Sequence, residues 1–157
     1  MDNIKERFRQ YQEAIETSNI VSKTDTNGTI TFVNDEFCKM SGFTREELIG
    51  ANHNIVRHPE VPKEVFARLW DTILAKKVHK GTIRNRTKDG RDVYLNTTII
   101  PILDLSGQIE EFLAIRYDVT DVINLNNELE KTKKELLNLN ENLENRVAEQ
   151  TAELVNL

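Results

Sequence analysis

The sequence predicts an α+β domain in which short helices cover one face of a five-stranded antiparallel sheet. Two observations indicate this class. First, three pairs of turn residues, Asn27-Gly28, Asp89-Gly90 and Ser106-Gly107, each separate two runs with strand character. Second, two such runs precede a central helical region and three follow it, so the last three strands should form a meander. A cavity between the helices and the sheet is natural in such a layout.

Composition allows one domain with a proper core and argues against nucleic-acid binding and a membrane segment. The chain has 157 residues, 38% hydrophobic and 30% charged, with a net charge of −5. This acidic balance, without a stripe of Lys and Arg, argues against nucleic-acid binding. Because no apolar run approaches roughly 18 residues and no signal peptide begins the chain, we expect a soluble, cytoplasmic piece with no membrane segment. Cys38 is the only cysteine, so we expect a small buried hydrophobe and no internal disulfide.

The first 18 residues predict an amphipathic helix. Apolar side chains recur at steps of 4, 3 and 4 residues, at Ile4, Phe8, Tyr11 and Ile15, between charged and glutamine positions. This stripe must pack on something. The following core and a second copy of the chain are both open.

The strand pattern begins at Ile20, where the rhythm changes to a period of two. The pair Asn27-Gly28 predicts a hairpin with a type I′ turn, in which both central residues have positive φ. The later strands are predicted over 82–86, 93–102 and 111–117.

Two short helices are predicted between the hairpin and the central stretch, over 35–41 and 45–49. Thr44 stands at the N-cap of the second, Glu47 takes the capping-box position, and Gly50 follows its end. These local signals place a helical region between the second and third strands.

The central stretch, residues 53–70, holds two histidines, an arginine, a glutamate and the only tryptophan. Pro59 and Pro62 lack a backbone N–H, so residues 54–61 should form a loop or broken turn, and Pro62 is placed to open the next helix. That helix presents one apolar face, formed by Val65, Phe66, Leu69, Trp70, Ile73 and Leu74. The polar loop should therefore lie at the rim of whatever this face covers.

Three features carry a resemblance to a known family: the order of the elements, the run at 32–50 and the Asp-Val-Thr at 118–120. On these features, the chain resembles the PAS sensor domains over roughly residues 12–121. The resemblance implies the PAS fold and a sensory role.

A narrower resemblance involves the central stretch. The run Asn-Ile-Val-Arg-His-Pro-Glu-Val-Pro at 54–62, with Phe66 and Trp70 behind it and Asn85-Arg86 in the third strand, resembles the flavin-binding PAS domain of bacterial aerotaxis receptors. The resemblance implies FAD as cofactor, and the matching positions are Asn34, Arg57, His58, Glu60, Phe66, Trp70 and Asn85.

The chemistry of these residues suits a flavin. An arginine such as Arg57 can hold a pyrophosphate with two hydrogen bonds, and Trp70 with Phe66 supplies flat apolar surface for a ring system. Asn85 can both donate to and accept from the edge of the ring.

Two departures from this subfamily keep other readings open. His79 stands where the subfamily has a tryptophan, and Leu95 where an aromatic residue is expected after Tyr94. A PAS domain that only dimerises, without a ligand, is therefore an alternative. Another is a PAS domain that binds haem b, with His79 as the iron ligand, which we rank below flavin.

The singled-out residues also have simpler interpretations. Phe66 and Trp70 at helical spacing are ordinary core residues unless the resemblance holds, and Arg57 with Glu60 could form a surface ion pair. The two histidines of the stretch lack a third ligand at metal spacing, so we expect no zinc site. A flavoenzyme would have only His58 as proton donor and needs a substrate pocket that nothing in the sequence indicates. We expect a regulatory piece, not an enzyme.

Residues 121–157 predict a coiled coil that forms a parallel homodimer. A helix of this length would span roughly 55 Å, too long to fold back on so small a domain. Past residue 143 the apolar positions shift as in a stutter, and the end resembles linkers that precede histidine kinase or diguanylate cyclase output domains. The seam consists of Val122, Leu125, Leu129, Thr132, Leu136, Leu139 and Leu143.

Together these features predict three segments: an N-terminal helix at 1–18, a PAS sensor domain at 19–120 and a signalling helix at 121–157. We expect a dimeric module that senses redox state or oxygen through FAD and passes the signal to an output domain. Asp118 and Thr120 are the expected relay, with Asp118 pinning the end of the last strand and Thr120 capping the signalling helix.

Overall fold

The computed structural model describes residues 1–156, and only Leu157, the last residue of the predicted coil, lies outside that range. The chain divides into two compact units, Met1–Thr120 and Asp121–Leu157. The elements are α1 (Asp2–Ser18), β1 (Ile20–Thr24), β2 (Ile30–Val33), α2 (Asp35–Ser41), α3 (Arg45–Leu48), the 3₁₀ helix η1 (His53–Val56), α4 (Lys63–Leu74), β3 (His79–Arg86), β4 (Asp92–Leu103), β5 (Ile109–Asp118) and α5 (Thr120–Val155).

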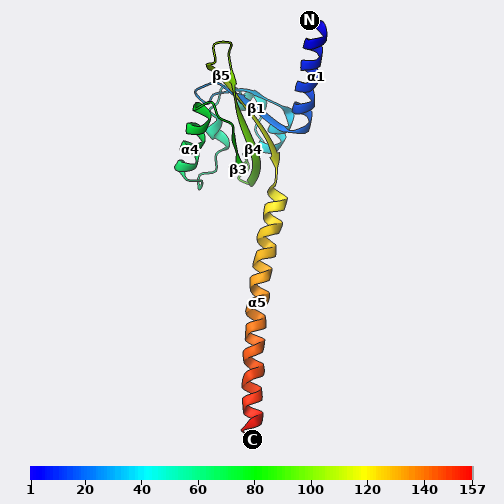
Figure 1. Ribbon diagram of the computed structural model, residues 1–157, viewed down its shortest axis with the longest axis vertical. Helices are drawn as coiled ribbons and strands as arrows, with labels where there is room; N and C mark the ends of the chain where they lie inside the picture. The colour runs from blue at the N-terminus through cyan, green and yellow to red at the C-terminus, as the bar shows by residue number, and fades with distance from the viewer. Residues whose placement is uncertain (157) are drawn as a thin grey trace. The chain divides into compact units, whose positions relative to one another are not determined.

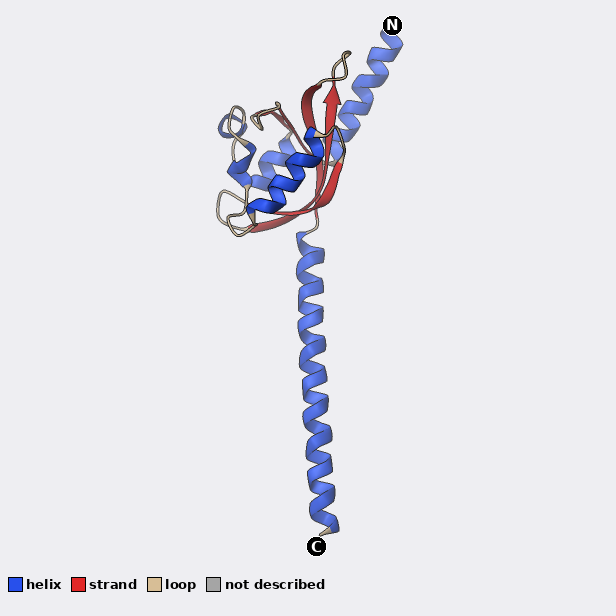
Figure 2. Cartoon of the chain, turned by 60° about the vertical axis from the view of Figure 1, so that its left-hand side comes forward, coloured by secondary structure: helices blue, strands red, loops and turns tan. Residues whose placement is uncertain are grey.

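The first unit contains the five-stranded antiparallel sheet that the sequence predicts. Its strand order is β2-β1-β5-β4-β3, so the first and last strands of the sequence pair at its centre. Figure 2 shows α4 and the short helices lying over one face of this sheet. The α+β prediction and the order of its elements are confirmed.

Two apolar clusters join the helices to the sheet. In the first, Phe37 of α2 and Leu48 of α3 are fully buried against strand residues such as Leu95. In the second, α4 buries Leu69 and Ile73 against Phe112 of β5. The helical face predicted for α4 therefore covers the sheet through Leu69 and Ile73, whereas Leu74, predicted on the same face, is 52% exposed. Figure 1 shows where this helix lies.

The local helix signals are confirmed. The Thr44 side chain accepts a hydrogen bond from the backbone N–H of Glu47, whose carboxylate accepts from the N–H of Thr44, which completes the capping box. Pro62 is the N-cap of α4, and the proline-flanked segment before it forms a single 3₁₀ turn followed by loop.

The prediction of a type I′ turn at Asn27-Gly28 is wrong. Within residues 1–156 Lys76 is the sole non-glycine residue with positive φ, so only the glycine of each turn pair is left-handed. The residue three positions before the glycine holds each turn instead, because its side chain accepts a backbone N–H from the residue after the glycine. These acceptors are Asp25, Thr87 and Asp104.

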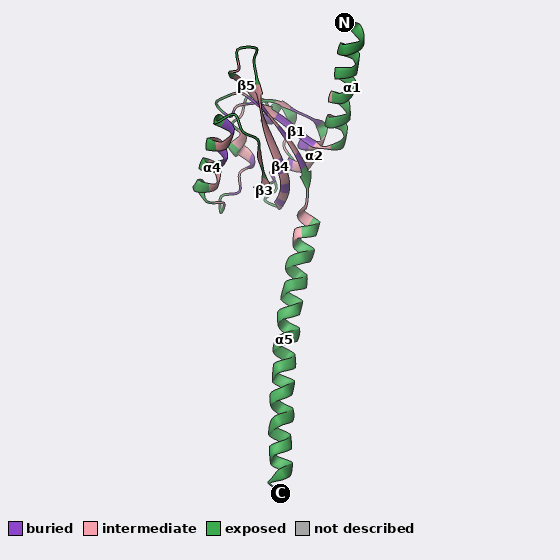
Figure 3. Ribbon diagram, in the orientation of Figure 1, coloured by how far each residue is buried: buried purple, intermediate pink, exposed green. Residues whose placement is uncertain are grey.

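The two long helices expose their apolar stripes. Neither α1 nor α5 has a buried residue among those described, and in Figure 3 α5 is coloured as exposed along most of its length. On α1, Phe8 is 68% exposed, and on α5, Leu129 is 67% exposed. Over residues 1–156, no helix is both long and apolar enough to cross a membrane.

Candidate functional site

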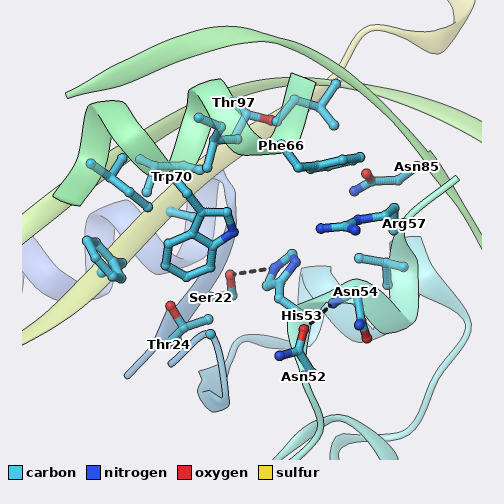
Figure 4. A pocket seen from close by; sticks show the side chains of 18 of the residues that line it. Ser22, Thr24, Asn52, His53, Asn54, Arg57, Phe66, Trp70, Asn85 and Thr97 are labelled. Carbon is cyan, nitrogen blue, oxygen red and sulfur yellow. Dashed lines mark hydrogen bonds between the residues drawn. The ribbon is translucent and has the colours of Figure 1, made fainter. Parts of the chain in front are cut away.

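The candidate site is a pocket between α4, the η1 turn and the inner face of the sheet. Its cavity volume, measured as the space that the centre of a water molecule can occupy, is about 90 Å³. Phe66 and Trp70 of α4 and Phe112 of β5 supply much of its apolar wall. Figure 4 shows Arg57 and Asn85 beside Phe66, across the pocket from Trp70, with His53 between the two sides.

Arg57 follows η1 directly and is held there by its backbone. Its N–H donates to the carbonyl of Asn54 at 3.0 Å, and Arg57 forms a bridge to Asn85 of β3. The guanidinium carbon lies 3.8 Å from the centre of the Phe66 ring. Its Nε is buried and has no hydrogen-bond partner. An orphaned buried donor is costly, and an acceptor brought to this position would lower that cost.

A second guanidinium, that of Arg116 on β5, lies in the pocket wall and is 3% exposed. It donates to the hydroxyl of Ser22 and to Nε2 of His53, both at 2.9 Å. Its carbon lies 5.4 Å from the centre of the Phe37 ring. Burial lowers the pKa of Arg116 to about 10, which still leaves the group charged at neutral pH.

His53 is neutral in this arrangement. Because an arginine can only donate, Nε2 of His53 must be the acceptor, which assigns the ring proton to Nδ1. Burial, followed by the charge of Arg116, lowers the pKa of His53 to about 3. The imidazole is therefore a fixed acceptor for Arg116 over the physiological pH range.

This low pKa predicts acid sensitivity. Between the ordinary histidine value and about 3, the unfolded chain binds a proton at His53 that the folded chain does not. Stability therefore falls as pH falls, and we expect a loss of about 1.5 kcal/mol between pH 6.5 and pH 5.0. Urea unfolding of the wild type and of His53→Gln at both pH values measures it. The variant lacks this titration and keeps the other two histidines, so equal losses in the two proteins would contradict the assignment.

Trp70 forms the far wall of the pocket and approaches the first hairpin closely. Its ring makes an edge contact with Phe112, with centroids 5.7 Å apart. On its other side lies Gly28, where an added Cβ would lie 3.1 Å from Cζ2 of Trp70. Gly28 also has φ +85°, so it is required both for the turn and for the position of the indole.

Replacing Gly28 with alanine should therefore cost more than backbone strain alone. Gly107→Ala is the matched control, because Gly107 has a similar φ of +82° but open space around it. We expect Gly107→Ala to cost about 1–2 kcal/mol and Gly28→Ala about 1 kcal/mol more, from the crowding against Trp70. Urea unfolding measures both, and fluorescence of the only tryptophan should change for Gly28→Ala alone. Equal costs would show that the indole yields without penalty.

Four of the seven residues predicted to contact a cofactor line this pocket, namely Arg57, Phe66, Trp70 and Asn85. Asn34 does not. It is the N-cap of α2, where its side-chain oxygen accepts from the N–H groups of Val21 and Phe37. Its side-chain amide donates to the carbonyls of Glu16 and Asn19. Every polar group of this side chain is thus used to join α1, β1 and α2.

His58 and Glu60 also lie outside the pocket lining. His58 is 1% exposed, donates from Nε2 to Asp92 at 2.9 Å and accepts the N–H of Glu60 at Nδ1. Arg84 lowers the pKa of Asp92 and pairs at the surface with Glu60 at 3.0 Å. Among residues 1–156, Arg57 and Glu60 do not form the surface ion pair that the sequence suggested, and Glu60 pairs with Arg84 instead. The network instead fastens the loop that carries Arg57 to the hairpin of β3 and β4.

The two expected relay residues lie at the end of β5, with their roles exchanged. The Asp118 carboxylate accepts the backbone N–H of Thr120 at 2.9 Å, so Asp118 caps the first turn of α5. The Thr120 hydroxyl instead accepts the backbone N–H of Tyr94 on β4, also at 2.9 Å. Thr120, the last residue of the first unit, is thereby attached to β4.

Sequence reasoning missed Arg116 and Ser22, and considered His53 only as a metal ligand. A signal for Arg116 was present, because it continues the inward alternation of Phe112 and Ala114 along a predicted strand. Within residues 1–156 no cluster of three potential metal ligands occurs. The two residues that differ from the resembled subfamily, Leu95 and His79, do not line the pocket. Leu95 is buried in the core.

Comparisons with known proteins agree with the observed fold. A family model described as the PAS fold matches residues 6–119. The aerotaxis receptor of Escherichia coli is 37% identical over 102 residues, which cover 65% of this chain and 20% of the receptor. The chain spans about a fifth of the length of the curated relatives that it matches first.

Solved structures show the same fold. A PAS domain from Colwellia psychrerythraea superposes with a TM-score of 0.67 at 23% identity, covering 73% of this chain and 98% of that one. A light-oxygen-voltage domain described with a flavin analogue gives a TM-score of 0.65 at 17% identity, covering 77% of this chain and 93% of that one.

Proposed function

The chain belongs to the PAS family of sensory signal-transduction modules, and from that premise we propose that its pocket binds FAD and senses redox state or oxygen. The proposal rests mainly on the surroundings of the Arg57 side chain. Its guanidinium stacks on Phe66, and its buried Nε lacks an acceptor within the described chain. A pyrophosphate would satisfy that donor with charge-assisted hydrogen bonds.

The other pocket residues fit a flavin ring. Trp70 and Phe66 offer flat apolar surface, and the Asn85 amide, 5% exposed, can donate to and accept from a ring edge. When bound, FAD would supply a group that takes up and releases electrons. The chain's own residues would bind the ring, orient it and exclude water.

We further propose that the module regulates and does not catalyse. His58, the one proton donor expected of a flavoenzyme, is bonded at both ring nitrogens and lies outside the pocket lining. A cytoplasmic setting and an attached output domain, a histidine kinase or diguanylate cyclase, belong to this proposal. So does the relay from the pocket through β4 to the end of β5. The states of the cofactor must then bind two conformations of the domain unequally.

Dimerisation through α5 is the partner interaction that we propose. Its apolar seam is exposed, from 48% at Leu143 to 67% at Leu129, and needs a second helix to cover it. We expect a dimer by sedimentation at micromolar concentration. A chain ending at residue 120 serves as the control and should sediment as a monomer unless the stripe on α1 also pairs. A monomeric full chain would contradict the coiled coil.

An absorbance spectrum of freshly purified protein, expressed with ample riboflavin, tests the cofactor. A flavin spectrum is expected, and chromatography of the heat-released compound against FAD and FMN standards identifies it. A haem band would support the alternative haem-binding reading. A spectrum without chromophore, unchanged after incubation with FAD, would leave the ligand-free dimerisation module in its place.

A further inference from the structure

The pocket carries more positive charge than its described surroundings compensate. Two guanidinium groups line it, Arg57 and Arg116, and no aspartate or glutamate is found in its lining among residues 1–156. Arg116 forms no ion pair with a described carboxylate, although it is 3% exposed. Its two partners, Ser22 and His53, are neutral.

Burying an unpaired charge is costly, and a fold that keeps one there needs a reason. Packing does not explain an arginine at this position, because its inward neighbours along β5, Phe112 and Ala114, are apolar and an apolar side chain would suit the same surroundings. The contact with the Phe37 ring and the two hydrogen bonds reduce the cost without neutralising the charge. An anionic ligand in the pocket would neutralise the charge of Arg116.

We propose that Arg116, oriented by neutral His53 and Ser22, selects a ligand whose buried ring carries negative charge. The inference rests on the proposed function and deepens it. Oxidised flavin is neutral at its ring, and its reduction by two electrons and one proton leaves one negative charge there. Arg116 favours this reduced anion over the oxidised ring, and so sets the potential at which the sensor switches. Arg116 is a charge-selecting residue for the bound form, distinct from Arg57, which we assign to the phosphates.

The test is the reduction potential of bound FAD, measured by anaerobic titration with dithionite as reductant. Arg116→Gln should lower the equilibrium constant for reduction at least tenfold, which is a shift of about −30 mV for a two-electron couple. Arg116→Lys keeps a charge and should change the constant less than threefold. Arg86→Gln removes an exposed charge from β3, outside the pocket lining, and is the matched control, with less than a threefold change expected.

The wild type offers a second measurement that does not depend on the variants folding. Reduced flavin in mildly acidic water takes up a second proton, whereas an anion held by Arg116 does not. The potential should therefore change by about 30 mV per pH unit between pH 5.5 and 6.5, the value for one proton per two electrons. A slope of about 59 mV, the value for two protons, would overturn the inference, as would equal potentials in Arg116→Gln and Arg86→Gln.

These outcomes are distinguishable from failure of the proposed function. Wild-type protein that binds no FAD overturns the proposed function and this inference together. Wild-type protein that binds FAD with the two-proton slope, or with a potential insensitive to Arg116→Gln, overturns only the role of Arg116. A tenfold loss in Arg116→Lys equal to that in Arg116→Gln would also overturn it, because the effect would then follow side-chain shape and not charge.

Discussion

Replacing Arg57 with alanine is expected to weaken FAD binding by about 2 to 3 kcal/mol, or roughly 30- to 150-fold, because hydrogen bonds to a charged group are lost. The fold should survive. The side chain forms no hydrogen bond with the described chain through its buried Nε, so truncation removes an orphaned donor together with the contact to Phe66. These effects oppose each other, and the free energy of unfolding should change by less than about 1 kcal/mol. Fluorescence titration of apo-protein with FAD, paired with urea unfolding, measures both quantities.

Arg68→Ala is the control for this experiment, because Arg68 is exposed on the same helix that carries Phe66. It should leave both binding and stability unchanged. Trp70→Phe complements it by keeping most of the apolar volume, whereas Trp70→Ala would confound binding with a lost contact to Phe112. Full FAD occupancy in Arg57→Ala would refute the assignment of Arg57 to the phosphates.

The largest loss of stability is expected at Phe37. This side chain is fully buried and makes an edge contact with the His53 ring, with centroids 5.8 Å apart. Phe37→Ala should lower the free energy of unfolding by about 3 to 5 kcal/mol through the cavity it leaves. Phe37→Leu keeps most of the volume and should cost less than about 1.5 kcal/mol. Urea unfolding of the apo-protein measures both.

A matched exposed site controls for the loss of apolar surface as such. Leu105 lies fully exposed at the tip of the hairpin between β4 and β5, and Leu105→Ala should stay within about 0.5 kcal/mol of the wild type. A cost for Phe37→Ala no greater than that for Phe37→Leu would mean that the core closes over the vacancy.

The predictable part of the fold is the part that depends on neighbours in sequence. The capping box at Thr44 and Glu47 and the proline start of α4 are local hydrogen-bond and dihedral effects, and both were predicted to within a residue or two. The turn at Gly28 was placed correctly but given the wrong type. The reason is that Asp25, two residues upstream of the Asn-Gly pair, supplies the side-chain acceptor that favours a different turn.

The site was only partly predictable. The central stretch and its helix place Arg57 and Trp70 at the pocket through local geometry alone. The pairing of Arg116 with His53 joins residues 63 positions apart and depends on which strand lies beside which. The contact of His58 could not be predicted for the same reason, since its partner Asp92 belongs to a hairpin whose position no local signal reveals.

The central pairing of β1 with β5 has a consequence for the order of events as the chain emerges from a ribosome. The bond between Ser22 and Arg116 spans 94 residues, so the wall of the pocket exists only after almost the whole first unit has been synthesised. Until then β1 has only β2 beside it, and an isolated two-stranded hairpin is barely stable in water. Contacts between residues so far apart in sequence slow folding. The chain loses the entropy of closing a long loop before the contacts that stabilise the closed form are made. A ligand of this pocket therefore meets a nearly finished domain, and would stabilise it by mass action against the nascent states that precede it.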